Sequence, residues 1–175
     1  FLIGGRAIGE TLVDDARVRL VSATGSTAMG AAVGPRLARR FARAILELGG
    51  NNASIVCASA DQQLALRAIS FAAVGTAGQR CTSLRRLFVH DSLYDTFVPR
   101  LRAAYASVPV GDPRQPGTLV GPLIDNAACE AMQRSLADAR NVGGQISGGD
   151  AVEVGGHAGA RYVRPALVEM PGQTE

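Results

Sequence analysis

The sequence of 175 residues contains no lysine and no tryptophan, so its 18 basic residues are all arginine. Without lysine, this segment can hold neither a Schiff-base lysine nor a phosphate-binding lysine. Aromatic residues make up only 5% of the chain. No apolar run approaches the roughly 20 residues that cross a bilayer, and no cleavable signal is visible. These absences lead us to expect a cytoplasmic protein with no membrane partner.

Cysteine and histidine are also scarce. Cys57, Cys81 and Cys129 contain no CxxC pair, and an odd number of widely spaced thiols argues against a disulfide framework or a structural zinc site. The two histidines, His90 and His157, offer little for a metal ion. We therefore expect reduced thiols and no bound metal.

Positive charge is modest, with a formal net charge of +3, but four arginines gather at Arg36, Arg39, Arg40 and Arg43. Such a cluster fits either a nucleic-acid footprint or the solvated face of a helix. No aromatic platform or recognised nucleic-acid module accompanies it. The helix face is favoured, and we expect no nucleic-acid partner.

Apolar segments of strand and helix character alternate along the chain. Strands are predicted at Arg19–Ala23, Ala44–Leu48, Ser54–Cys57, around Ile146 and at Tyr162–Met170, with another at Leu87–His90. Helices are predicted at Gly9–Ala16, from Thr27 onward, at Asp61–Val74, after a Ser92 cap, and from Asp125 to Asn141. The apolar helix positions include Met29, Val33, Leu37, Leu64, Ile69, Phe71, Phe97, Leu101 and Tyr105. This alternation favours an α/β fold with a parallel sheet.

A glycine-rich turn, Gly25-Ser26-Thr27-Ala28-Met29-Gly30, lies between a predicted strand and a predicted helix. Helix N-termini expose unpaired N–H groups and a partial positive charge, so the turn could cradle a phosphate. It is not GxGxxG and has no Gly-Lys-Ser/Thr. As a bare pattern, ordinary turn chemistry explains it better.

Glu47 ends an apolar strand and is followed by Leu48 and two glycines. A carboxylate buried there would be costly without a purpose, whereas an edge-strand glutamate facing water would need none. The residues alone leave both interpretations open.

Cys81 follows Arg80 within the small-residue segment Gly75–Ser83. A nearby positive charge favours the reactive thiolate. Cys57, between Val56 and Ala58, has instead the apolar neighbours of a core cysteine. Neither histidine lies in a motif with Cys81, so a carboxylate is the more attractive catalytic partner.

These segments together resemble the aldehyde dehydrogenase superfamily: Thr24–Thr27, Glu47–Gly50 and Gly78–Cys81 occur in the family's order and spacing. The resemblance runs through Gly121-Pro122-Leu123 to Pro165–Val168. Most members have lysine after the two glycines, where this chain has Asn51-Asn52. That pair, with Gly75–Thr82 and Arg85-Arg86-Leu87, is similar to the α-aminoadipic semialdehyde (piperideine-6-carboxylate) dehydrogenase branch of lysine degradation.

The resemblance implies an internal piece of a longer NAD-dependent enzyme, which would be a homotetramer. Phe1 to Leu48 would be the last part of a Rossmann-like NAD-binding domain. Gly49 to Glu175 would be the first part of an α/β catalytic domain. The isolated piece would then be inactive, because the rest of the cofactor site lies outside it.

The resemblance also implies residue roles. Cys81 would be the nucleophile that forms a thioester with the aldehyde substrate, and Glu47 the general base. The cofactor would be bound by Thr24, Gly25, Ser26, Thr27, Gly30 and Leu48, and by Gly5. Arg80 and Thr82 would contact substrate, although Arg80 could instead pair with a local acid or favour the Cys81 thiolate. Two alternatives stay open: a sibling enzyme for another aldehyde, and a fragment that is non-catalytic on its own.

Overall fold

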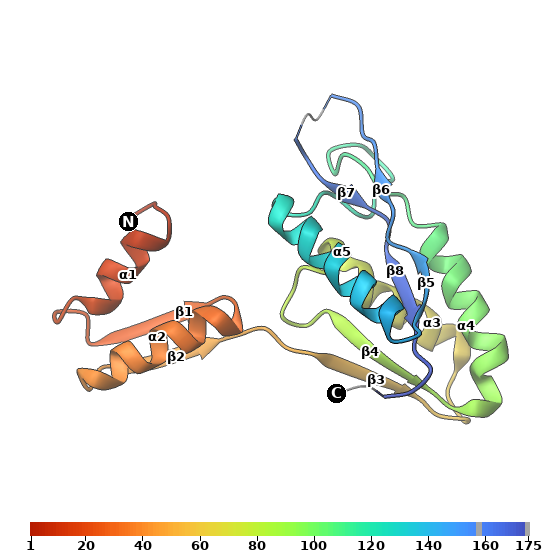
Figure 1. Ribbon diagram of the computed structural model, residues 1–175, viewed down its shortest axis with the longest axis horizontal. Helices are drawn as coiled ribbons and strands as arrows, with labels where there is room; N and C mark the ends of the chain where they lie inside the picture. The colour runs from red at the N-terminus through yellow and green to blue at the C-terminus, as the bar shows by residue number, and fades with distance from the viewer. Residues whose placement is uncertain (157–158, 174–175) are drawn as a thin grey trace. The chain divides into compact units, whose positions relative to one another are not determined.

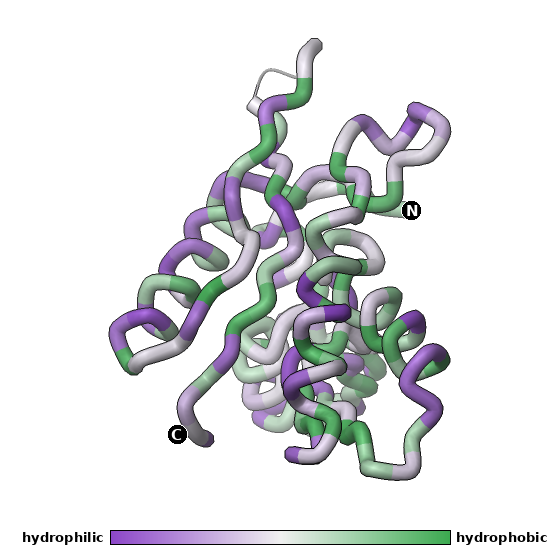
Figure 2. Tube along the Cα trace, turned by 90° about the vertical axis from the view of Figure 1, so that its right-hand side faces the viewer, coloured by the Kyte–Doolittle hydropathy of each residue, from purple (hydrophilic) through white to green (hydrophobic). Residues whose placement is uncertain are grey.

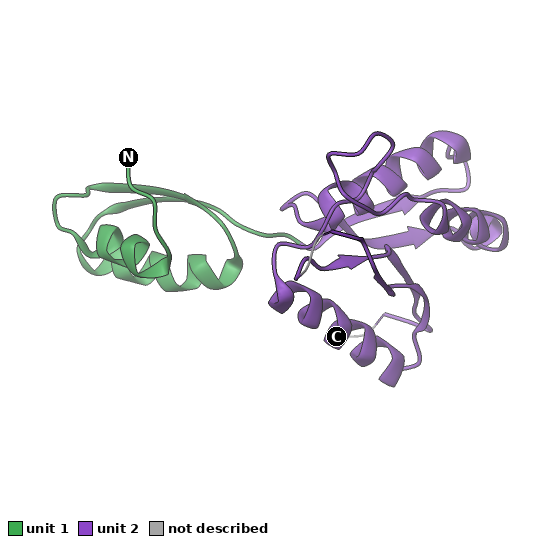
Figure 3. Ribbon diagram, turned by 90° about the horizontal axis from the view of Figure 1, so that it is seen from above, with its two compact units in different colours: residues 1–50 green, residues 51–175 purple. Residues whose placement is uncertain are grey.

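The computed structural model describes residues 1–156 and 159–173, and the chain forms two compact units, residues 1–50 and 51–175 (Figure 3). Both units combine helices and strands, in agreement with the predicted α/β class. Across the described ranges, none of the helices combines the length and apolar character that crossing a membrane requires.

The first unit is a strand–helix–strand motif preceded by a helix (Figure 1). Its elements are α1 (Arg6–Asp14), β1 (Leu20–Thr24), α2 (Thr27–Arg39) and β2 (Arg43–Glu47). β1 and β2 pair in parallel, with Thr24 opposite Glu47. Parallel strands need a crossover connection, which α2 supplies. Both strands therefore end at the same edge, where the predicted cofactor turn begins.

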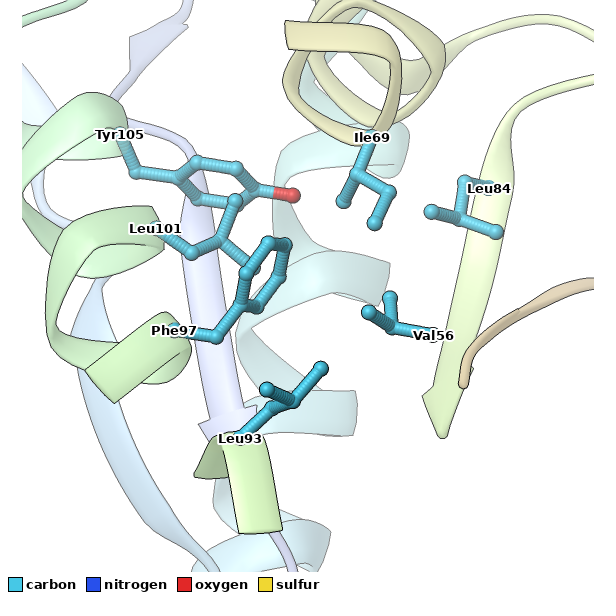
Figure 4. Packing of buried hydrophobic residues seen from close by; sticks show 7 residues of the cluster. All are labelled: Val56, Ile69, Leu84, Leu93, Phe97, Leu101 and Tyr105. Atoms are coloured by element: carbon cyan, nitrogen blue, oxygen red, sulfur yellow. The ribbon is translucent and has the colours of Figure 1, made fainter. Parts of the chain in front are cut away.

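The second unit opens with another parallel pair. The parallel pair is β3 (Asn52–Val56) and β4 (Leu84–Val89). Between and after these strands lie α3 (Gln62–Val74), the 3₁₀ turn η1 (Gly75–Gly78) and α4 (Asp91–Ala106). Figure 4 shows the buried cluster that joins β3, α3, β4 and α4: Val56, Ile69, Leu84, Leu93, Phe97, Leu101 and Tyr105. Burial raises the pKa of Tyr105 to about 12, which keeps this phenol neutral inside the core.

The remaining elements are α5 (Asn126–Asn141), β5 (Gln145–Gly148), β6 (Ala151–Val152), β7 (Tyr162–Val163) and β8 (Ala166–Glu169). Figure 2 shows hydrophilic and hydrophobic residues interspersed along the helical parts of the trace. β5 pairs with β8 and β6 with β7, both antiparallel. The prediction of a parallel sheet is thus wrong for this part, where the chain folds back through loops and needs no crossover helix.

The strand predicted at Tyr162–Met170 is two short strands in different sheets. The break falls at Arg164-Pro165. Proline has no N–H to donate to a strand ladder, and the Arg164 N–H donates to the Asp150 carbonyl at 2.8 Å. The chain therefore leaves one sheet before it enters the other.

Two of the predicted helix caps are confirmed and two helix starts are wrong. The Asp61 and Asp125 side chains accept hydrogen bonds from the first turns of α3 and α5. α4 begins at Asp91, and its cap is His90, whose ring accepts from the Ser92 N–H. α1 begins at Arg6 and contains Gly9, which a helix tolerates at a modest cost in stability.

The predicted apolar positions divide by helix face. Ile69 is buried, whereas Leu64 and Phe71 are 63% and 69% exposed. At 3.6 residues per turn, positions five before and two after Ile69 point away from it. Cys57 is exposed and does not belong to the core.

Candidate functional site

In the first unit, the edge where β1 and β2 end gathers most of the predicted cofactor residues with Glu47. The Gly25 N–H donates to the Glu47 carbonyl at 3.0 Å, directly beyond the Thr24–Glu47 pair. The Glu47 side chain is exposed. Ligands of open α/β sheets bind at this kind of edge, where strands end and helices begin.

The N-terminus of α2 completes this edge. Ser26 is its N-cap, and its hydroxyl oxygen accepts from the Met29 N–H at 3.1 Å. The Thr27 and Ala28 N–H groups have no hydrogen-bond partner among residues 1–156 and 159–173. Unpaired N–H groups at the positive end of a helix dipole suit an anionic group such as a phosphate.

Gly30 and Leu48 are linked by packing. A Cβ added at Gly30 would lie 2.4 Å from Leu48 Cδ1, so the absence of a side chain lets Leu48 lie against α2. Gly5 is placed differently, at the N-cap of α1, where an added Cβ would meet nothing within 4 Å. The structure thus gives Gly30 a packing reason to be glycine, and gives Gly5 none.

In the second unit, Cys81 lies in a tight turn, residues 80–83, between η1 and β4 (called here the Cys81 turn). Ser83, only 1% exposed, closes it: its N–H donates to the Arg80 carbonyl and its hydroxyl oxygen accepts from the Arg80 N–H, both at 3.1 Å. In a trans peptide the N–H points opposite to the C=O. The Cys81 N–H therefore points out of the turn.

The Cys81 thiol is exposed, and the Cys81 N–H has no hydrogen-bond partner in the part of the chain that the structure describes. A sulfur nucleophile and a free backbone donor thus belong to the same residue. Acyl-transfer chemistry uses a nucleophile and an oxyanion donor together, because the donor can stabilise the oxyanion that forms when the nucleophile attacks.

The segment before the Cys81 turn has unusual backbone geometry. Thr76, Ala77 and Gly78 have φ values of 56°, 53° and 70°, a left-handed run that costs a non-glycine residue roughly 1–2 kcal/mol. Arg85 NH2 donates to the Gly78 carbonyl at 2.5 Å and holds this run against β4. Strained backbone persists where its surroundings fix it, often at functional sites.

Gln79 ties the same segment to the loop before α5. Its Oε1 accepts from the Ile124 N–H at 2.8 Å. Its Nε2 donates to the Thr76 and Pro122 carbonyls at 3.1 and 3.3 Å. The side chain next to Arg80 thus fixes the entry to the Cys81 turn.

Arg80 is exposed, and its guanidinium carbon lies 5.5 Å from the centroid of the Phe71 ring, a cation–π contact. No carboxylate pairs with Arg80 among the described residues. The expectation of a local acid partner therefore finds no support. Thr82, the residue after Cys81 in the same turn, is also exposed.

Metal ligands were not expected. Within residues 1–156 and 159–173, no three His, Cys, Asp or Glu side chains gather in a way that could hold a metal ion. His90 caps α4, and His157 lies outside the described residues.

The sequence did not single out Asn52, Ser83 or Arg85 as parts of the site. Asn52 Nδ2 donates to the Cys81 carbonyl at 2.7 Å and to the Ser83 carbonyl at 2.9 Å. The available signal was the amide pair Asn51-Asn52 at the start of β3, because strand residues are mostly apolar and asparagine is depleted in strands. Its partner 29 residues later could not be read from the chain.

Comparison with known proteins gives a consistent result. The model of the aldehyde dehydrogenase family matches residues 1–174. The chain is 46% identical over 165 residues to alpha-aminoadipic semialdehyde dehydrogenase of Mus musculus, and the matched region covers 94% of this chain and 30% of that protein. It is 45% identical over 168 residues to aldehyde dehydrogenase family 7 member A1 of Malus domestica, covering 95% of this chain and 32% of that protein. The chain thus spans about a third of the length of these relatives.

Solved structures show the same fold. Lactaldehyde dehydrogenase from Escherichia coli is 35% identical, with a TM-score of 0.86, over 92% of this chain and 33% of that one. Succinate-semialdehyde dehydrogenase from Burkholderia pseudomallei is 34% identical, with a TM-score of 0.86, over 95% of this chain and 34% of that one. The predicted α/β fold, similar to that of aldehyde dehydrogenases, is confirmed.

Proposed function

Because the chain belongs to the aldehyde dehydrogenase family, we propose that the enzyme containing it, at the length of its relatives (the full-length enzyme), oxidises an aldehyde to a carboxylic acid with NAD. The observation that supports this most directly is the Cys81 turn, with its exposed thiol and a Cys81 N–H unpaired within the described residues. A thiolate there can attack a carbonyl carbon while this N–H donates to the new oxyanion.

In the proposed reaction, Cys81 Sγ bonds to the aldehyde carbon and gives a thiohemiacetal. Loss of a hydride from that carbon would leave a thioester on Cys81, and NAD, held by the residues at the edge where β1 and β2 end, would supply the hydride acceptor. The Glu47 carboxylate takes a proton from water as the water oxygen attacks the thioester carbon. The carboxylic acid is released and the Cys81 thiolate is restored.

The cofactor proposal rests on the edge where β1 and β2 end. The free N–H groups of Thr27 and Ala28, beside the Ser26 cap, suit a pyrophosphate. Thr24 and Leu48 follow from the family resemblance as neighbours of the nicotinamide. Gly25 is proposed as the point of close approach, since its N–H is already bound to Glu47 and it presents no side chain.

For the substrate, we propose α-aminoadipic semialdehyde or its cyclic form, piperideine-6-carboxylate. The support is the similarity to the Mus musculus enzyme of that name, together with an exposed Arg80 next to Cys81. A guanidinium can bind a carboxylate through two parallel hydrogen bonds. From the same resemblance we propose that the full-length enzyme is a cytoplasmic homotetramer.

Arg80→Ala in the full-length enzyme tests the substrate. We expect KM for α-aminoadipic semialdehyde to rise by a factor of ~10 or more, since a charged hydrogen bond contributes ~1.5–3 kcal/mol. KM for a simple aliphatic aldehyde, which has no carboxylate, should stay within about twofold. The measurement is steady-state NADH formation with both substrates.

Two matched variants separate the roles of Arg80. Arg80→Lys keeps the charge but not the two-bond geometry, so it should recover KM only in part. Phe71→Leu removes the ring beneath the guanidinium and should behave like wild type if the contact only packs the side chain. An equal loss on both aldehydes in Arg80→Ala would argue for an effect on Cys81 and remove the main reason to name this substrate.

Comparison of the full-length enzyme with the isolated 175-residue chain tests the function itself. The full-length enzyme should form NADH from the aldehyde. The isolated chain should be inactive and bind NAD poorly, because it holds one strand–helix–strand unit of the cofactor fold. Calorimetric titration with NAD gives the affinity, and a micromolar Kd for the isolated chain would show that the proposed domain boundaries are wrong.

A further inference from the structure

The Asn52 side chain donates two hydrogen bonds to the Cys81 turn. Its Nδ2 lies 2.7 Å from the Cys81 carbonyl oxygen and 2.9 Å from the Ser83 carbonyl oxygen. Both partners can only accept, so the amide must present its NH₂ group to them; the flipped amide would set oxygen against oxygen. Both N–H bonds of one amide are thus used on one turn.

Asn52 reaches the turn because of strand register. It begins β3 and lies opposite Leu84, which begins β4 directly after the turn. The register shifts between Asn52 and Ala53, so this first pair departs from the regular ladder. The backbone just before it is also held, since Arg86 donates to the Asn51 carbonyl through Nε and NH2 at 3.2 and 2.8 Å. The base of the Asn52 side chain is therefore fixed.

These bonds complete the restraint of Cys81. The peptide before Cys81 is held within the turn, because its carbonyl, that of Arg80, accepts from the Ser83 N–H. The peptide after Cys81 is held by Asn52 alone among the described residues, through the Cys81 carbonyl. With both flanking peptide planes fixed, the Cys81 N–H and the Cα–Cβ bond that carries Sγ keep one relative direction.

We propose that Asn52 is a positioning residue for the nucleophile, which holds Cys81 so that its thiolate and its backbone N–H act on the same carbonyl group. This inference rests on the proposed function. Asn52 contacts neither substrate nor cofactor in the proposal and acts only through the turn. Its effect should therefore fall on the chemical step, and cofactor affinity should be spared.

Asn52→Asp in the full-length enzyme is the central test. Aspartate has nearly the same shape but sets a carboxylate oxygen against two carbonyl oxygens. We expect kcat to fall at least tenfold, or ~1.4 kcal/mol, with KM for NAD within twofold of wild type. Asn52→Ala removes the donors without adding repulsion and should lose no more than Asn52→Asp. A packing role would give the opposite order, with aspartate tolerated and alanine impaired.

Hydrogen exchange supplies a readout that does not depend on activity. In Asn52→Asp, the peptide that spans residues 79–84 should exchange at least threefold faster, while a peptide from α4 should be unchanged. Asn141→Asp makes the same chemical change at the exposed end of α5 and should alter neither exchange nor kcat. If Asn52→Asp fails to fold, the same two measurements on Asn52→Ala decide.

Wild-type kcat and unchanged exchange of residues 79–84 in the folded Asn52 variants would overturn the inference. That result would leave the proposed function intact as long as Cys81→Ala is inactive. An active Cys81→Ala enzyme would instead overturn the proposed function, whatever Asn52 does. The two failures are therefore distinguishable.

Discussion

Cys81→Ala in the full-length enzyme is expected to abolish aldehyde oxidation, with kcat lowered by a factor on the order of 10⁴ or more, as for loss of other covalent nucleophiles. No thiohemiacetal can form without the sulfur, so hydride transfer has no substrate. NAD binding should persist, because the residues proposed to hold the cofactor lie in the other unit. NADH formation gives the rate, and calorimetry gives the cofactor affinity.

Cys57→Ala is the matched control for this variant. Cys57 is also an exposed thiol, but it follows β3 and has no part in the Cys81 turn. It should therefore leave kcat unchanged. Turnover of Cys81→Ala within tenfold of wild type, a loss of only ~1.4 kcal/mol, would refute the assignment of the nucleophile.

Glu47→Gln is expected to separate the two halves of the reaction. The amide keeps the shape of the side chain but cannot accept a proton from water, so thioester hydrolysis should slow by ~10²-fold or more. Hydride transfer precedes that step and should stay rapid. Rapid-mixing measurements should show a burst of about one NADH per active site, followed by slow turnover.

Glu153→Gln, the same change at an exposed glutamate of the second unit, should leave both phases unaltered. Loss of the burst in Glu47→Gln with an equal loss of the overall rate would place Glu47 before acylation. A steady-state rate equal to that of the wild type would show that Glu47 has no catalytic role.

The sequence predicted most reliably the features that depend on residues near in the chain. Asp61 and Asp125 sit directly before helical segments, and both cap their helices. The four-residue spacing of Phe97, Leu101 and Tyr105 places all three in the core. The family resemblance rested on short motifs in a fixed order, and the comparisons confirm it. The roles of Cys81 and Glu47 stay predictions.

Other features could not be predicted because they depend on contacts between distant residues. Leu64 and Phe71 are apolar, but whether a second layer covers their face of α3 is not encoded locally, and both are exposed. The partner of β8 is β5 rather than β7, because Pro165 separates β8 from β7 and the pairing of β8 with β5 depends on the tertiary structure. The left-handed conformation of Ala77 contradicts its own local preference and persists only through its surroundings.

The hydrogen bonds that hold the Cys81 turn differ in how far apart their partners lie along the chain. Ser83 bonds to Arg80, three residues away, whereas Asn52 bonds to residues 29 and 31 positions later. Closing a long loop costs more entropy than closing a short one. During folding the Cys81 turn can therefore form early, whereas the Asn52 hydrogen bonds form only after β3 has paired with β4. During partial opening the order is reversed: release of β3 frees the turn while α3 and α4 can still be helical. We therefore expect the full-length enzyme to lose activity before α3 and α4 lose their helical structure.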